Sequence, residues 1–192
     1  MTTTRITQPA TEPITLAEAK AHLRLTHDDE DLLVSAMISA ARAACEDRLQ
    51  RTLITSDWRL TMPAFPLVPF IYLAMGDVQS VTAVTYTDPD GITQTLSPSA
   101  YRLGRSNGRP VLVPAPGQGW PATQAGVMEA VSVEYVAGYG NVAASVPAPL
   151  KAWILLALGD LFENRQATSI GDTVNPLPFA DGLLDTYRNF AL

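Results

Sequence analysis

The sequence predicts an α+β protein, with helices near both ends of the chain and a β-rich region between them. Apolar residues recur at helical spacing between residues 15 and 49. Short segments of alternating apolar and polar residues, separated by turn residues, follow between residues 56 and 140. A helix that is apolar on nearly every face comes next, before a short tail. A chain of 192 residues is long enough for one substantial domain with its own core, or for one domain with an inserted subdomain.

Two N-terminal helices are predicted from capping and charge. Residues 1–13 are Thr-rich and lack periodicity, so we expect a flexible arm. Thr15 and Glu18 match a capping box, which opens a short helix. The acidic residues 28–31 favour the positive end of a second helix, which runs to about Leu49. Its apolar stripe is predicted to be Leu33, Met37, Ala40, Ala44 and Cys45, with Arg42, Glu46, Asp47 and Arg48 facing water.

The middle of the chain is predicted to be β-rich. Strands are expected at Trp58–Met62, Phe70–Leu73, Val78–Thr87, Ile92–Leu96, Val111–Val113 and Val131–Val136. Asp88-Pro89-Asp90-Gly91 between two of them predicts a hairpin turn.

The helix after the last strand is unusually apolar. Pro147 and Pro149 fit a first helical turn, so we expect the helix to begin near Val146. Its apolar circumference requires cover on more than one side, by the protein's own core or by a neighbouring subunit. Gly159 suggests that another backbone passes close by. The residues expected to pack in the core or between subunits are Leu33, Met37, Trp153, Ile154, Leu158 and Phe162. The apolar run is well short of the roughly 20 residues that a bilayer needs, so no membrane span is expected.

The sequence offers little catalytic chemistry. No nucleophile elbow, phosphate-binding loop, dinucleotide fingerprint or zinc-spaced Cys/His pair occurs. Residues 28–31, with His22 and His27 nearby, are the only plausible metal site, but consecutive acids at a helix start fan outward. Cys45 lies in a helical pattern and is expected to be a buried, inert thiol, which fits a reducing cytoplasm. We therefore predict no catalytic residue, no bound metal, no cofactor and no enzymatic activity.

Charge limits the candidate partners. The net charge of −6 argues against electrostatic binding of nucleic acid by the whole chain. Residues 91–128 nevertheless hold Arg102, Arg105 and Arg109 and no acid. These arginines surround a turn-rich tip, which is either an exposed loop made soluble by charge or a contact with DNA phosphates or an acidic neighbour.

Several segments together resemble the head-tail connector proteins of tailed bacteriophages, the adaptor or head-completion group described as gp6-like or gp8-like. At the N-terminal end the resemblance rests on Ile14–Leu25, the acids at 28–31 before residues 40–46, and Arg51–Leu53. At the C-terminal end it rests on Tyr135–Gly140, Val146–Arg165 and Leu184–Arg188.

The resemblance implies a small helical bundle made from the N- and C-terminal helices, with the β segments inserted as a subdomain. The implied divisions are an arm at 1–13, the bundle at 14–55 and 141–166, the insertion at 56–140, and a tail with a short docking helix at 167–192. Within the tail, Leu183, Leu184, Tyr187, Arg188 and Phe190 are the implied portal-docking residues.

The implied function is structural. Such proteins form a ring, expected to be twelve-fold, in the virion neck between the portal and a tail-side stopper or tail terminator protein. DNA passes through the ring without sequence readout, and the protein is made in the host cytoplasm. Two alternatives remain open at this point: a monomeric protein-binding module, and a metal-dependent hydrolase using residues 28–31.

Overall fold

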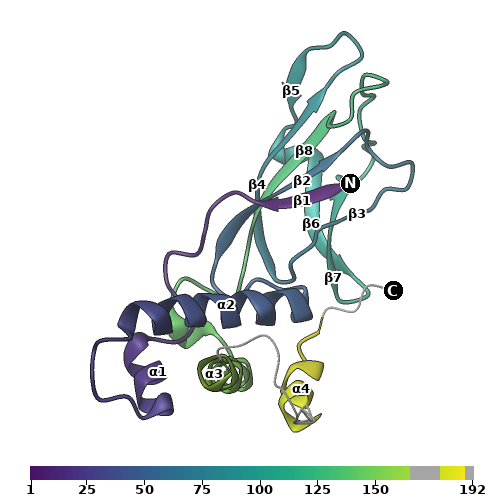
Figure 1. Ribbon diagram of the computed structural model, residues 1–192. Coiled ribbons are helices and arrows are strands. Elements are labelled where there is room, and N and C mark those ends of the chain that lie inside the picture. The colour runs from purple at the N-terminus through teal and green to yellow at the C-terminus, as the bar shows by residue number, and fades with distance from the viewer. Residues whose placement is uncertain (165–177, 189–192) are drawn as a thin grey trace, which may run out of the picture. The chain divides into compact units, whose positions relative to one another are not determined.

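The computed structural model describes residues 1–164 and 178–188 and divides the chain into two compact units. A β unit combines Met1–Pro9 with Thr55–Gly138, and a helical unit combines Ala10–Ile54 with the chain from Tyr139 onward (Figure 1). Helices and antiparallel sheets are both present, which confirms the predicted α+β class.

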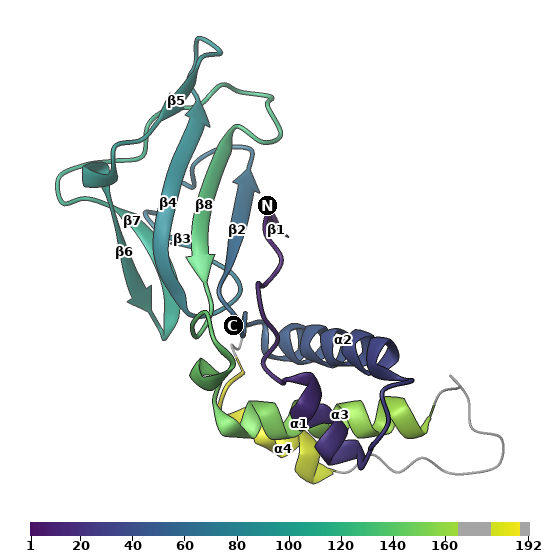
Figure 2. The same cartoon turned by 90° about the vertical axis from the view of Figure 1, so that its left-hand side faces the viewer.

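The β unit contains two antiparallel sheets (Figure 2). The five-stranded sheet has the order β1-β2-β8-β4-β5, with β1 at Thr2–Arg5, β2 at Ser56–Met62, β8 at Val131–Ala137, β4 at Val78–Thr87 and β5 at Thr93–Thr95. The three-stranded sheet has the order β3-β7-β6, with β3 at Ile71–Tyr72, β7 at Arg109–Pro114 and β6 at Tyr101–Ser106. A short 3-10 helix, η1, spans Pro98–Ala100.

The core of the β unit follows from strand alternation. Along β2 every second residue is buried, and β8 pairs with it so that Leu60 lies opposite Val133 and Trp58 opposite Tyr135. Side chains on one face of each strand therefore pack together, while the other face is polar. Residues of both sheets, including Ile71 and Leu112, complete a single cluster.

The hairpin predicted at Asp88–Gly91 is confirmed. The Asp88 carboxylate accepts hydrogen bonds from the backbone N–H groups of Asp90 and Ile92, at 3.1 and 2.9 Å. Gly91 has a φ of +83°, a conformation that costs other residues steric strain.

The flexible arm predicted at residues 1–13 is wrong for its first part. Thr2–Arg5 forms β1, an edge strand that pairs with β2 from Thr2 opposite Thr61 to Arg5 opposite Trp58. The Arg5 guanidinium carbon lies 4.6 Å from the centroid of the Trp58 ring. An edge strand with mostly polar residues has no apolar pattern to reveal it, and its partner lies more than fifty residues away in the sequence.

The helical unit contains α1 at Leu16–Leu23, α2 at Asp31–Leu49, α3 at Ala148–Glu163 and α4 at Pro178–Asp185. A short 3-10 helix, η2, spans Ala143–Ser145 before α3. Helices α1, α3 and α4 lie on the same side of α2 (Figure 1). No helix in the described ranges combines the length and the apolar composition needed to span a bilayer.

Two helix starts agree with the sequence analysis. The predicted capping box is confirmed: the Glu18 N–H donates to the Thr15 hydroxyl, and the Thr15 N–H donates to the Glu18 carboxylate. Helix α3 has Pro147 at its N-cap and Pro149 in its first turn.

The stripe predicted for α2 is displaced by about one residue. Its buried apolar residues are Val34, Ile38, Ala41, Cys45 and Leu49, whereas Leu33 is 38 % exposed, Met37 is half-buried, and Ala40 and Ala44 are exposed. Arg42 and Glu46, predicted to face water, are buried. The pattern is displaced because this charged pair occupies the buried side of the helix, which a count of apolar residues cannot anticipate.

The close backbone expected beside Gly159 is not found among the described residues. Within them, a Cβ built on Gly159 would meet only the His22 Nε2 atom, at an ordinary contact distance of 3.6 Å. Trp153, Ile154 and Leu158 are buried in the core of the helical unit, and Phe162 is half-buried against it.

Candidate assembly surfaces

A buried charge network ties the chain before α1 to α2. The Arg42 Nε donates to Glu12 at 2.7 Å, and its Nη1 donates to Glu46 at 2.8 Å. The second Glu46 oxygen accepts the backbone N–H of Leu53 at 2.8 Å. The side chains of Arg42 and Glu46 are only 7 % and 3 % exposed. The network therefore ties two chain segments to α2: the one before α1, through Glu12, and the one after α2, through Leu53.

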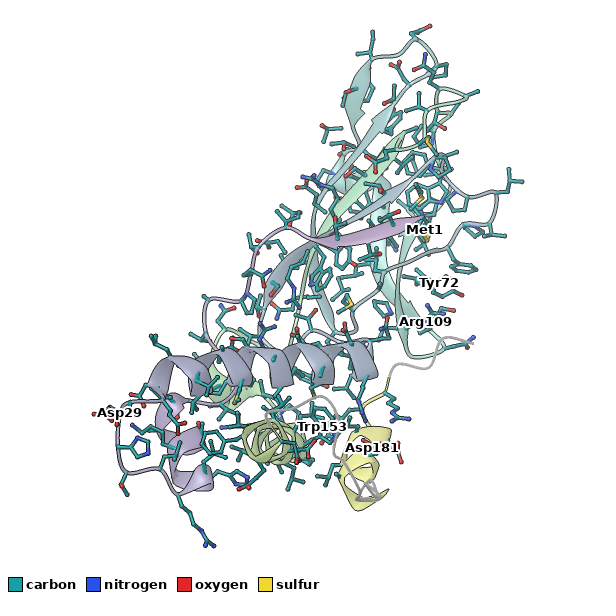
Figure 3. The ribbon with its side chains drawn as sticks, viewed as in Figure 1. Met1, Asp29, Tyr72, Arg109, Trp153 and Asp181 are labelled. Carbon is teal, nitrogen blue, oxygen red and sulfur yellow. The ribbon has the colours of Figure 1, made fainter. Side chains whose placement is uncertain are left out.

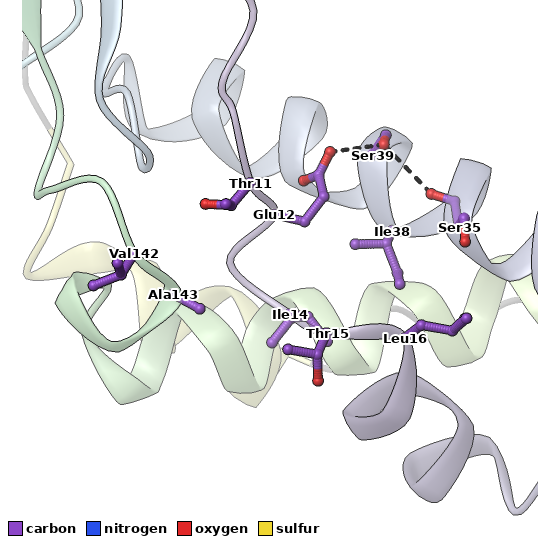
Figure 4. Close-up of a pocket in the computed structure, with 10 residues that line it drawn as sticks. All are labelled: Thr11, Glu12, Ile14, Thr15, Leu16, Ser35, Ile38, Ser39, Val142 and Ala143. Atoms are coloured by element: carbon purple, nitrogen blue, oxygen red, sulfur yellow. Dashed lines mark hydrogen bonds between the residues drawn. The ribbon is translucent and has the colours of Figure 1, made fainter.

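An apolar pocket of about 410 Å³ lies beside this network (Figure 4). It is lined by residues from the chain before α1, from the start of α1, from α2 and from the chain around η2. These are Thr11, Glu12, Ile14, Thr15, Leu16, Ser35, Ile38, Ser39, Val142 and Ala143.

Most polar side chains of this pocket have partners within the helical unit. Glu12 accepts from both Arg42 and Ser39, and the Thr11 hydroxyl donates to the carbonyl of Asn141. The Thr15 hydroxyl is held in the capping box. What the pocket offers to an occupant is therefore mainly apolar surface.

Helix α3 presents an apolar ridge on its outer side. Ala148, Ala152 and Leu156 recur every four residues and are all exposed, Leu156 by 38 %. Leu156 is rotated by about 200° from the buried Ile154, so the ridge faces away from the helical core. Lys151, next to the ridge, is paired with Glu18 at 3.0 Å.

The predicted docking helix packs on its own bundle, which corrects one assigned role. Leu184 is fully buried in the helical core, so it is not an exposed docking residue. Leu183 and Tyr187 are half-buried against the same core. Arg188 lies 3.6 Å from Asp185. Phe190 lies outside the described residues.

Asp181 holds α4 against α2 and α3 (Figure 3). Its carboxylate accepts from the Arg48 guanidinium and, at 3.4 Å, from the Trp153 indole N–H. Arg48 also lies over the Trp153 ring, with its guanidinium carbon 5.2 Å from the ring centroid. The sequence pattern did not signal this contact, because the three residues come from three separate helices.

The three arginines singled out from the sequence, Arg102, Arg105 and Arg109, do not form a single basic patch. They belong to the β6–β7 hairpin, where strand alternation places Arg102 and Arg105 on opposite faces. Arg105 is paired with Asp77 at 3.0 Å. Arg109 lies over the Tyr72 ring, 4.8 Å from its centroid (Figure 3). Arg102 is exposed, which leaves a weaker basic surface than the sequence suggested.

The acidic residues before α2 are engaged by a lysine. Lys20 of α1 donates to both Asp28 and Asp31. Its hydrogen bond holds the pKa of Asp28 below the ordinary value. Among residues 1–164 and 178–188, no group of three His, Cys, Asp or Glu residues is arranged to hold a metal ion.

A second apolar region lies in the β unit. Phe65 and Trp120 stack with their ring centroids 5.0 Å apart, and together with Pro66, Leu67 and Pro114 they line a pocket of about 460 Å³. Leu67, Val68 and Phe70 on the loop between β2 and β3 are exposed. Phe70 was expected to begin a strand, but β3 begins one residue later, at Ile71.

These features define a class of protein: a two-unit α+β protein with exposed apolar surfaces and satisfied charges, suited to contacts with other chains. Residues 13–96 match the model of a family described as phage gp6-like head-tail connector protein. The match spans α1, α2 and strands β2 to β5. No curated protein matches the chain.

Solved structures extend the similarity to the whole chain. One, from the neck of an empty gene transfer agent particle computed with C6 symmetry, is 25 % identical with a TM-score of 0.84. A second, from the virion of a native gene transfer agent particle, is 25 % identical with a TM-score of 0.83. A third, from the neck of a native particle computed with C12 symmetry, is 24 % identical with a TM-score of 0.81. Each alignment covers 100 % of this chain and 97 % of the other. The resemblance to phage head-tail connector proteins is thus confirmed.

Proposed function

We propose that this protein is a structural component of a virion neck, a head-tail connector that forms a ring between the portal and a tail-side protein. The observation that carries the proposal is the whole-chain similarity, at a TM-score of 0.84, to a protein from the neck of a phage-like particle. A family match over residues 13–96 supports the same role. The proposed role depends on assembly and requires no catalytic group.

A ring architecture is supported by the symmetry of the similar particles and by the surface of this chain. The similar necks were computed with six-fold and twelve-fold symmetry. Each subunit of a cyclic ring must present two different faces to its neighbours. We propose a twelve-fold ring, and the exposed ridge of α3 and the apolar pocket described above supply two such faces.

We further propose that DNA passes through the ring without sequence readout. The net charge of −6 supports passage over retention, because a strongly basic channel would bind phosphates and hold the genome back. The tail-side neighbour in this proposal is a stopper or tail terminator protein.

Portal docking is assigned to the C-terminal part of the chain, with one correction. Leu184 serves the helical core, which leaves Leu183, Tyr187 and Arg188, together with Phe190, as the docking candidates. Deletion of α4 would also remove Leu184, so lost binding could then reflect lost folding. Arg188→Glu is a sharper test, with exposed Arg24→Glu at the C-cap of α1 as the matched control.

The test of the function is cryo-electron microscopy of this protein mixed with the portal from the same genome, beside mass photometry of the protein alone. A ring of subunits on the portal is the expected result. A monomer that does not contact the portal would refute the connector role and favour a monomeric binding module.

A further inference from the structure

Within residues 10–54, 139–164 and 178–188, the helical unit carries a concave and a convex apolar surface that no other described segment covers. The pocket between the chain before α1 and helix α2 has the buried side chains of Ile14 and Ile38 at its base. Val142, at its edge, is 56 % exposed. On α3, the ridge of Ala148, Ala152 and Leu156 projects away from the core.

Leu32 extends the apolar surface beyond the pocket. It precedes Ser39 by seven residues, so both side chains leave α2 in nearly the same direction. Its side chain is 90 % exposed, although leucine in the first turn of a helix has no structural need to face water. An exposed leucine on one side of the pocket and an exposed valine at its edge are typical of a groove that receives another apolar surface.

The electrostatics of the two surfaces match. Glu12, the charged residue of the pocket lining, is neutralised by Arg42 at 2.7 Å. Lys151, beside the ridge, is neutralised by Glu18. Contact between the two surfaces would therefore bury no unpaired charge at these positions, which is the condition for a favourable apolar interface.

The geometry points to a second copy of this chain as the occupant of the pocket. We propose that the α3 ridge of one subunit docks in the next subunit's pocket, the one between the chain before α1 and helix α2. The two surfaces lie on different sides of the helical unit, so their contact is heterologous and repeats from copy to copy until a ring closes. This inference rests on the proposed ring and adds the residues that join its subunits.

The contact can be tested by cysteine cross-linking of the full chain in the presence of the portal. Val142→Cys and Leu156→Cys in the same chain, treated with a short bis-maleimide, should give a ladder of covalent oligomers that extends past the dimer. Each single variant should give no ladder. Cys45 does not interfere, because burial raises its thiol pKa to about 12. Val142→Cys with Ile92→Cys is the matched control, since Ile92 is exposed at the turn between β4 and β5 and belongs to neither apolar surface.

Introducing charges at the two contact positions provides an independent readout. Leu156→Glu should lower the fraction of protein in rings about tenfold or more, because it sets a carboxylate against an apolar lining. Adding Val142→Arg to that variant should restore ring formation by pairing the two new charges across the junction. Circular dichroism of each free variant shows whether it is folded, and both substituted positions are exposed, so folding should be retained.

The outcomes separate this inference from the proposed function. Rings that form normally in Leu156→Glu, with no ladder from the Val142→Cys/Leu156→Cys chain, would overturn the ridge-and-pocket contact and leave the connector role intact. A wild-type chain that forms no oligomer with or without the portal would overturn both.

Discussion

Removing the Arg42 side chain should destabilise the helical unit strongly. Arg42→Met keeps most of the aliphatic stem but removes the ion pair with Glu46, whose side chain is 3 % exposed. Breaking a buried ion pair by removing one member costs about 3–5 kcal/mol, because the remaining charge is then less well compensated in a low-dielectric environment. Since whole domains are stable by about 5–15 kcal/mol, this loss should bring the helical unit close to unfolding.

Replacing Glu12 should lower the free energy of unfolding less than replacing Arg42. Its side chain is 30 % exposed, and Glu12→Gln keeps one acceptor oxygen for Arg42 while its NH2 group can donate to the Ser39 hydroxyl in place of the second oxygen. We expect a loss of about 1–2 kcal/mol, because a charged hydrogen bond becomes a neutral one while Arg42 keeps Glu46. The order of effects, Arg42→Met well above Glu12→Gln, follows from burial alone.

The assay is urea unfolding monitored by hydrogen-exchange mass spectrometry, which reports the unfolding of the helical unit and of the β unit separately. Arg59→Met is the control, because the Arg59–Glu134 pair in the β unit is exposed and such pairs contribute about 0–1 kcal/mol. If Arg42→Met lowered the free energy of unfolding no more than Arg59→Met, the buried network would contribute no more than an exposed ion pair. The explanation given for the displaced α2 stripe would then be refuted.

Three further predictions concern groups in the helical unit. Glu18→Gln should cost about 1 kcal/mol at neutral pH, a figure reduced for solvent screening because the side chain is 44 % exposed. The Thr15 backbone hydrogen bond, with that from Lys151, lowers the Glu18 pKa from 4.5 to about 2. Its stabilisation is therefore complete above pH 4.5 and is lost as pH falls toward 2, so chemical unfolding at a series of pH values should show the wild type and variant converging there. Asp181→Ala should release α4, because it removes the acceptor shared by Arg48 and Trp153; exchange in residues 178–188 should rise while the β unit is unchanged, and equal exchange would contradict the contact. Cys45 should resist alkylation in the native protein and react fully in urea, because burial raises its pKa to about 12; rapid native labelling would show that the helical core opens readily.

Local patterns were sufficient where a few neighbouring residues determine the conformation. The capping box of Thr15 and Glu18 is formed as predicted. The turn that begins at Asp88 also has its expected hydrogen bonds, and β4 has its predicted bounds. Each of these depends on backbone groups within four residues or on a long run of β-branched residues, so the sequence alone carries the information.

Features that depend on distant pairing were missed or placed wrongly. Strand β1 exists because Thr2–Arg5 meets β2, and nothing within residues 1–13 indicates that partner. Arg42 and Glu46 were assigned to the solvent side of α2 because charged residues usually face water, but the two charges satisfy each other inside the fold. Leu184 was assigned to a partner surface for the opposite reason, since an apolar residue in a tail does not reveal whether its own bundle covers it.

The two apolar surfaces of the helical unit also combine features that local sequence predicts with features that only tertiary packing creates. The apolar circumference of α3 was evident from the sequence, and with it the need for cover on more than one side. Its buried side is covered by α2 within the chain, while Ala148, Ala152 and Leu156 remain exposed. The pocket could not be found in the same way, because its lining combines the chain before α1, helix α2 and the segment around η2, which only the fold brings together. The need for further cover is a property of one helix and follows from its composition, whereas the face of α3 that stays exposed and the shape of the pocket both depend on tertiary packing. The sequence therefore predicts that α3 requires a second contact, and the fold determines where that contact lies.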